Sequence, residues 1–167
     1  ITDLKQFSKL DAPAKARVLL GQEQFSVCGF DLECTSLKPN VGRILCASFK
    51  PLNEEPYTFS ALDRRFFERD VYDDGKLATA IRNELEKYDI IMGWNSKMFD
   101  AKFLNSRLIH AGQRTKKAQP HIDGMWAFRS KASAWSGLKA VQEYILPGGV
   151  EKTRVVWEQW MRALGWD

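Results

Sequence analysis

The sequence has little of what disulfide-rich, zinc-binding and membrane-spanning proteins contain. It holds only three cysteines, Cys28, Cys34 and Cys46, and no Cys-x-x-Cys pair, which argues against a zinc site or a disulfide framework and favours reduced core thiols. No apolar run approaches the ~18 residues of a membrane-spanning helix, and no secretory signal leads the chain. We therefore expect a cytoplasmic, intracellular protein that does not enter a membrane.

Composition and charge are those of an ordinary globular domain. Hydrophobic residues make up 44% and charged residues 28% of the 167 residues, which predicts a single domain over residues 1–167 with an adequate core. The formal net charge of +4 supports a polyanionic partner but is too small to establish one.

Two carboxylates stand at the end of an apolar run, in the segment Phe30-Asp31-Leu32-Glu33. Because side chains alternate between the two faces of a strand, Asp31 and Glu33 are expected to point the same way, with Phe30 and Leu32 in the opposite layer. Carboxylates held close together repel each other, and a divalent cation between them relieves the repulsion. Taken alone, the pair is also compatible with a solvated strand face.

A third carboxylate follows a second short apolar strand. Residues 90–92 lead into Gly93-Trp94-Asn95, and a helical pattern follows that places Asp100 in its first turn. A carboxylate is favoured at the positive end of a helix, and the turn can bring it beside the tip of a neighbouring strand. Alternatively, Asp100 only complements the helix dipole and Asn95 only shapes the turn. This alternative explains each of the two residues separately, but it does not predict both of them together with the Asp-x-Glu pair.

These segments resemble the motifs of the DEDD superfamily of ribonuclease H-like 3′-5′ exonucleases. Residues 30–33, with 35–39 after them, are similar to the first exonuclease motif of that family. Residues 93–100 are similar to the second motif, in the form seen in family B polymerase proofreading domains and related stand-alone nucleases. The resemblance covers roughly residues 24–146.

The resemblance implies hydrolysis of phosphodiester bonds with two Mg²⁺ or Mn²⁺ ions. Asp31 would bridge both ions, Glu33 would hold one and orient the attacking water, and Asp100 would hold the other. The implied substrate is the 3′ end of single-stranded DNA or RNA, and an implied partner is a replication or repair protein. The residues expected against the nucleic acid near the metals are Ser36, Leu37, Trp94, Asn95 and Phe99.

The third motif of the family, a Tyr or His four residues before a final Asp on a C-terminal helix, has no counterpart in this sequence. Asp123 is the candidate for the fourth carboxylate, although an Asp before a Gly is more typical of a residue that braces a turn. Without this motif the chain is expected to be a weak or inactive catalyst. Two alternatives stay open: a nuclease-like module that binds nucleic acid without turnover, and a ribonuclease H-like endonuclease.

A basic segment, Arg114-Thr115-Lys116-Lys117, follows the helix of the second motif. Short basic runs are common on solvated surfaces. Close to a nuclease site, phosphate contact by Arg114, Lys116 and Lys117 becomes a comparable alternative.

The apolar pattern predicts an α/β fold, which the resemblance specifies as ribonuclease H-like: three layers, with helices flanking a mixed sheet whose first three strands are antiparallel. Residues 1–23 are expected to form a leading helical extension, and the C-terminal helix of the third motif is expected to be absent. Strands are expected over 24–33, 44–49, 57–59, from 90, and near 121–128. Helices are expected over 77–87, 99–111 and 136–144.

Overall fold

The computed structural model describes residues 7–9, 12–19, 25–66 and 73–131. The chain forms two compact units, residues 1–123 and 124–167, and the single domain expected over 1–167 stays a prediction. The helix expected over 136–144 lies outside the described residues. The elements are α2 (Ala12–Arg17), β1 (Val27–Cys34), β2 (Ile44–Pro51), β3 (Tyr57–Ser60), α3 (Gly75–Leu85), β4 (Ile90–Gly93), α4 (Asp100–His110) and β5 (His121–Asp123) in the first unit, and α5 (Gly124–Lys131) in the second.

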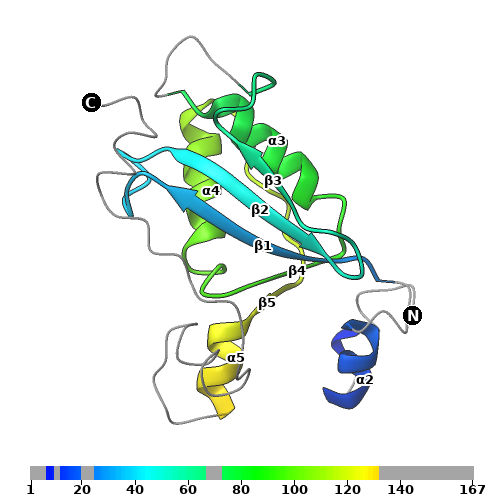
Figure 1. Ribbon diagram of the computed structural model, residues 1–167. Coiled ribbons are helices and arrows are strands. Elements are labelled where there is room, and N and C mark those ends of the chain that lie inside the picture. The colour runs from blue at the N-terminus through cyan, green and yellow to red at the C-terminus, as the bar shows by residue number, and fades with distance from the viewer. Residues whose placement is uncertain (1–6, 10–11, 20–24, 67–72, 132–167) are drawn as a thin grey trace, which may run out of the picture. The chain divides into compact units, whose positions relative to one another are not determined.

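A five-stranded mixed sheet in the order β3-β2-β1-β4-β5 organises the first unit (Figure 1). β1 pairs with β2, and β2 with β3, in antiparallel fashion. β4 pairs in parallel with β1 on one side and with β5 on the other. The predicted α/β class and the mixed sheet with antiparallel first strands are therefore confirmed.

Alternation along the strands creates one apolar and one polar face. In β1, Phe30 and Leu32 are buried whereas Asp31 and Glu33 are exposed. In the paired strand β2, the exposed Ser48 stands opposite Asp31. Because directly paired residues lie on the same face of a sheet, these carboxylates occupy the polar face.

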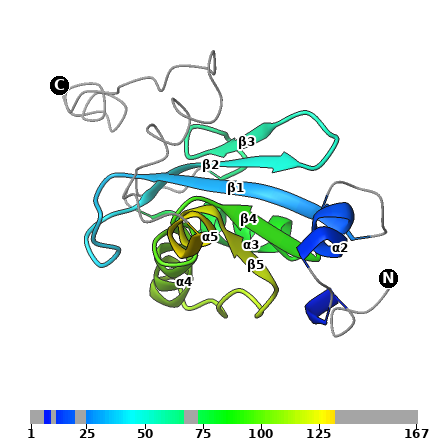
Figure 2. The ribbon, with the colours of Figure 1, turned by 90° about the horizontal axis from the view of Figure 1, so that it is seen from below.

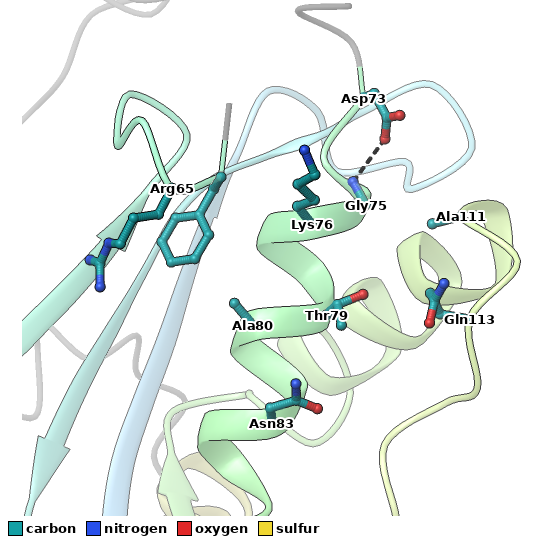
Figure 3. Close-up of a pocket in the computed structure, with 10 residues that line it drawn as sticks. Arg65, Asp73, Gly75, Lys76, Thr79, Ala80, Asn83, Ala111 and Gln113 are labelled. Carbon is teal, nitrogen blue, oxygen red and sulfur yellow. Dashed lines mark hydrogen bonds between the residues drawn. The ribbon is translucent and has the colours of Figure 1, made fainter. Parts of the chain in front are cut away.

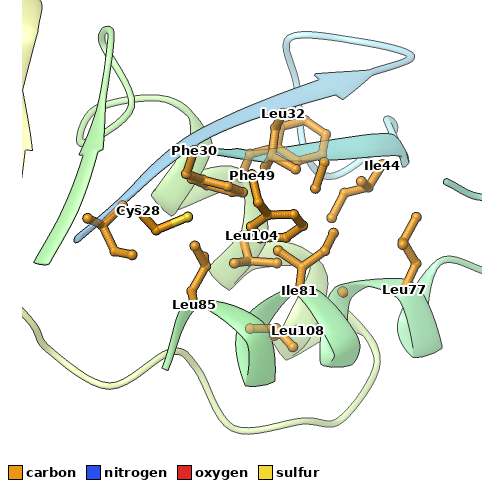
Figure 4. Packing of buried hydrophobic residues seen from close by; sticks show 14 residues of the cluster. Cys28, Phe30, Leu32, Ile44, Phe49, Leu77, Ile81, Leu85, Leu104 and Leu108 are labelled. Atoms are coloured by element: carbon orange, nitrogen blue, oxygen red, sulfur yellow. The ribbon is translucent and has the colours of Figure 1, made fainter. Parts of the chain in front are cut away.

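Helices α3 and α4 cover the apolar face of the sheet, as two views at right angles show (Figures 1 and 2). Figure 4 shows Phe30 and Phe49 of the sheet facing Ile81 of α3 and Leu104 of α4 in one buried cluster. A smaller cluster joins the residues before β1 to the start of β4, where Phe7 and Phe25 meet edge to face with ring centroids 5.6 Å apart. The core thus holds β1 and α4, the two elements that carry the three carboxylates, in a fixed relation.

The strand expected near 121–128 is shorter than predicted. It ends at Asp123, and α5 begins at Gly124. β5 pairs with β4 from Ile91 to Gly93. Because β4 ends at Gly93, the residues after Asp123 have no part of β4 with which to pair. None of the helices in the described ranges is both long and apolar enough to cross a membrane.

Candidate functional site

Asp100 is the buried member of the three carboxylates. It is the first residue of α4 and only 3% exposed. β4 pairs with β1 only as far as Gly29. Further along β1, the backbone N–H of Leu32 therefore donates to Oδ1 of Asp100, at 2.8 Å, instead of to a strand. The end of the parallel pairing thus creates the place for this carboxylate.

The other two carboxylates flank the amide to which Asp100 binds, because Asp31 precedes and Glu33 follows Leu32 in the chain. The pKa of Asp100 is raised to about 6, by burial first and then by the negative charges of Asp31 and Glu33, although the hydrogen bond from the Leu32 amide lowers it. The pKa of the nearby Cys34 thiol is raised to about 12, by burial first and then by the charges of the same three carboxylates. The three acidic groups therefore act on one another electrostatically.

This donor set fits a hard divalent cation in its chemistry. Carboxylate oxygens are the ligands that Mg²⁺ and Mn²⁺ prefer, and a cation would offset the repulsion that raises the pKa of Asp100. In the part of the chain that the structure describes, no three His, Cys, Asp or Glu side chains are arranged to hold a metal ion. Asp31 and Glu33 are exposed, and exposed side chains exchange between staggered rotamers at little cost.

The turn between β4 and α4 is held by a network of buried polar groups. Asn95 has a positive φ of 58°, a conformation that Asn tolerates better than most residues. The carboxylate of Asp123, 5% exposed, accepts the amide of Asn95 at 2.9 Å and that of Lys97 at 3.0 Å. Asp123, predicted as a candidate fourth carboxylate, thus binds the turn that leads to Asp100, which is the bracing role that its sequence position also indicates.

Two residues that support this turn, Ser96 within it and Gly93 at the end of β4, were not predicted from the sequence as site residues. The fully buried Ser96 shares a hydrogen bond of 2.8 Å with Nε2 of His121. A Cβ at Gly93 would lie 2.2 Å from Oγ of Ser96 and 2.8 Å from the carbonyl oxygen of Phe30. Only a glycine fits there, and no local sequence pattern shows that requirement.

The predicted nucleotide-binding residues fall into two groups. Leu37, 81% exposed, lies with Ser36 in the loop of residues 35–43 that follows β1, and Oγ of Ser36 accepts the amide of Lys38 at 3.2 Å. Trp94 and Asn95 are partly buried in the turn before α4. Phe99 is partly buried and packs against the core, with its ring centroid 5.8 Å from that of Phe103. Its side chain therefore contributes mainly to the packing of the core.

The structure does not bring the basic segment 114–117 together with the carboxylates. Arg114 pairs with Glu86 at the C-terminal end of α3, with an N–O distance of 2.6 Å. The Nζ of Lys116 is partly buried and donates to Oε1 of Gln119 at 2.7 Å. The segment therefore lies along the helices, which cover the face opposite Asp31 and Glu33.

A hollow of about 500 Å³ runs along the outer side of α3 (Figure 3). It is lined by Lys76, Thr79 and Asn83 of the helix, with Arg65 on one side and Gln113 on the other. Its one lining carboxylate, Asp73, accepts the amide of Gly75 at 2.9 Å. The hollow is separate from the three carboxylates of the predicted site.

The chain is similar in sequence to one known protein family and in fold to a solved structure. The family model of the RNase_H superfamily matches residues 28–162. No curated protein matches the sequence. Among solved structures, the chain resembles the family B DNA polymerase from the hyperthermophilic archaeon Pyrobaculum calidifontis, with a TM-score of 0.57 and 17% identity. That match covers 74% of this chain and 18% of the polymerase chain, so the likeness concerns the fold of a small part of the polymerase.

Proposed function

The chain belongs to the RNase H superfamily, and on that premise we propose that it is a metal-dependent 3′-5′ exonuclease of the DEDD type, acting on single-stranded DNA or RNA. The observation that carries the proposal is the contact between Asp100 and Leu32. It places a buried carboxylate at the backbone amide of Leu32, the residue that lies between Asp31 and Glu33. The two motifs identified in the sequence thus meet in space.

In the proposed site, Asp31, Glu33 and Asp100 would hold two Mg²⁺ or Mn²⁺ ions. When bound, the ions would supply an activated water and stabilise the charge that develops on the phosphate. The chain itself contributes the position of the carboxylates. Asp100 is fixed by the Leu32 amide, and the turn before it is fixed by Asp123.

The loops that follow β1 and β4 are the proposed contacts for the terminal nucleotide. Leu37 and Met98 expose 81% and 46% of their surface in these two loops, and apolar side chains of this kind can pack against a base. Lys38 and Lys97 are exposed in the same loops and can meet phosphates. Arg114, Lys116 and Lys117 remain proposed contacts for a more distant part of the strand.

The activity is tested with a single-stranded oligonucleotide labelled at its 5′ end, incubated with an excess of protein in Mn²⁺ and, separately, in EDTA. We expect a ladder of products shortened from the 3′ end in Mn²⁺ alone, and none with Asp31→Asn. A circular single strand is the second substrate. Cleavage of the circle would favour an endonuclease, whereas tight binding of both substrates without any product would favour a nucleic-acid-binding module and overturn the proposal.

A further inference from the structure

A buried ion pair lies next to the proposed site and is not used in it. Arg107 of α4 and Asp74, the residue before α3, are each 4% exposed. Two nitrogens of the guanidinium donate to the carboxylate. Nη2 lies 2.8 Å from Oδ1, and Nε lies 2.9 Å from Oδ1 and 3.0 Å from Oδ2. A buried charge without its partner is strongly unfavourable, so the two side chains hold each other in place.

The pair also holds the backbone inside the loop 35–43 and directly after it. Oδ2 of Asp74 accepts the amide of Ile44, the first residue of β2, at 2.7 Å. Nη1 of Arg107 donates to the carbonyl oxygen of Pro39, inside the loop, at 3.2 Å. Hydrogen bonds between residues of the loop stabilise its conformation; the Gly42 amide, for example, donates to the Lys38 carbonyl oxygen at 2.8 Å. The ion pair thus joins a preformed loop to both helices.

We infer that Arg107 is a positioning residue for substrate: its bond to Pro39, made while it is locked to Asp74, sets the place of Ser36 and Leu37 relative to Asp100. The inference rests on the proposed function, because Ser36 and Leu37 are the proposed contacts of the terminal nucleotide. Asp100 and Arg107 belong to the same helix. One rigid element therefore carries a carboxylate of the site at its start and the anchor of the nucleotide-binding loop near its end.

Arg107 acts through the loop and not on the reacting atoms. Its guanidinium is buried under the loop with its nitrogens directed to Asp74 and Pro39. Losing the bond to Pro39 should therefore loosen the loop and weaken substrate binding while the carboxylates keep their affinity for metal. A residue that only supported the fold would instead change all of these properties together.

The test uses Arg107→Lys, because a single ammonium can pair with Asp74 but lacks the fork that reaches Pro39 at the same time. The matched control is Arg82→Lys. Arg82 is also a buried arginine, 7% exposed, whose Nη1 donates to a loop carbonyl, that of Arg114, at 3.1 Å. If Arg107→Lys does not fold, Asp74→Asn/Arg107→Leu removes both charges together and keeps an acceptor for the Ile44 amide.

Hydrogen exchange of the peptide covering residues 35–43 is measured first, and then the affinity for a single-stranded DNA oligonucleotide in Ca²⁺ and for Mn²⁺ alone. We expect exchange in this peptide to be about tenfold faster and DNA affinity about fivefold to tenfold weaker, as for one lost hydrogen bond. The affinity for Mn²⁺ should stay unchanged in both variants, and Arg82→Lys, whose bond goes to Arg114 and not to the loop 35–43, should leave exchange in this peptide unchanged.

If the parent protein binds DNA, two results for Arg107→Lys would overturn the inference. One is unchanged exchange in the 35–43 peptide, and the other is faster exchange with unchanged DNA affinity. A parallel loss of affinity for Mn²⁺ would also overturn it, because the residue would then act on the whole site. Failure of the parent protein to bind any oligonucleotide would overturn the proposed function and this inference with it. Exchange and DNA binding therefore distinguish the two failures.

Discussion

Oδ1 of Asp100 lies 2.8 Å from the amide nitrogen of Leu32, a residue 68 positions earlier in the chain. This contact joins the start of α4 to the strand that carries Asp31 and Glu33. It keeps a carboxylate at a place where burial and two like charges disfavour its ionised form. The geometry is thus costly for an isolated protein and favourable for one that binds a cation.

The stability of the metal-free protein should therefore depend on Asp100 and on pH. Its pKa is raised from 3.8 to about 6, so the folded protein favours the protonated acid. That contribution is fully present below about pH 4 and is lost as the pH rises through about 6. Since one pKa unit corresponds to about 1.4 kcal/mol, the whole contribution is about 3 kcal/mol, and roughly 2 kcal/mol of it is lost between pH 4 and pH 7.

Urea unfolding in EDTA at several pH values measures this effect. Asp100→Asn should remove most of the decline between pH 4 and pH 7, whereas Glu55→Gln, at an exposed position in the turn after β2, should leave it in place. A decline of equal size in Asp100→Asn would show that other groups cause it.

Gly93→Ala should be strongly destabilising, because the added Cβ would overlap Ser96 and approach the Phe30 carbonyl oxygen to 2.8 Å. We expect a loss of about 3 kcal/mol or more in the free energy of unfolding, at the upper end for overpacking. Gly29→Ala is the control, because its Cβ would come no closer than 3.4 Å to the carbonyl oxygen of Lys50. Equal thermal midpoints for the two variants would contradict the close packing of the turn against β1.

Asp123→Asn should weaken the fold more than the metal site. One of the two amides that Asp123 now accepts would face an NH₂ group, at a cost of about 1–3 kcal/mol in the free energy of unfolding. The affinity for Mn²⁺, measured by calorimetry, should stay within about threefold of the parent, a change of less than 1 kcal/mol. A loss of Mn²⁺ affinity as large as that in Asp31→Asn would instead identify Asp123 as the fourth ligand.

Nucleic-acid binding should depend on salt chiefly through the two loops beside the carboxylates. Lys38→Ala/Lys97→Ala should lower the slope of log K against log salt by roughly two, the value for two lost phosphate contacts. Lys116→Ala/Lys117→Ala should change it by less than about one, because the Lys116 ammonium already donates to Gln119. The reverse order would establish the 114–117 segment as the main phosphate contact.

The local patterns of the sequence predicted the strands and helices that carry the site. Alternation in β1 separates Phe30 and Leu32 from Asp31 and Glu33, and this follows from the period of a strand alone. The position of Asp100 at the start of a helix was also readable, because the apolar strand and the turn before it limit where the helix begins. That prediction is confirmed by α4.

Long-range contacts were the part that the sequence could not predict. The basic residues 114–117 were expected near a nuclease site, but the partner of Arg114 is Glu86, and nothing local to either residue indicates that pairing. The same holds for Asp74 and Arg107, which meet only because α3 and α4 pack side by side. Charges far apart in a sequence become neighbours through packing of the core, which local patterns do not specify.

The most direct test of the proposed site is calorimetric titration with Mn²⁺ of the parent protein, Asp31→Asn and Asp100→Asn at pH 7.5, with Glu55→Gln as the control. We expect the parent and the control to bind Mn²⁺ with the same affinity, and each of the other two variants to bind it at least tenfold more weakly, a change of about 1.4 kcal/mol. Equal affinity in all four proteins would contradict a metal site at Asp31 and Asp100.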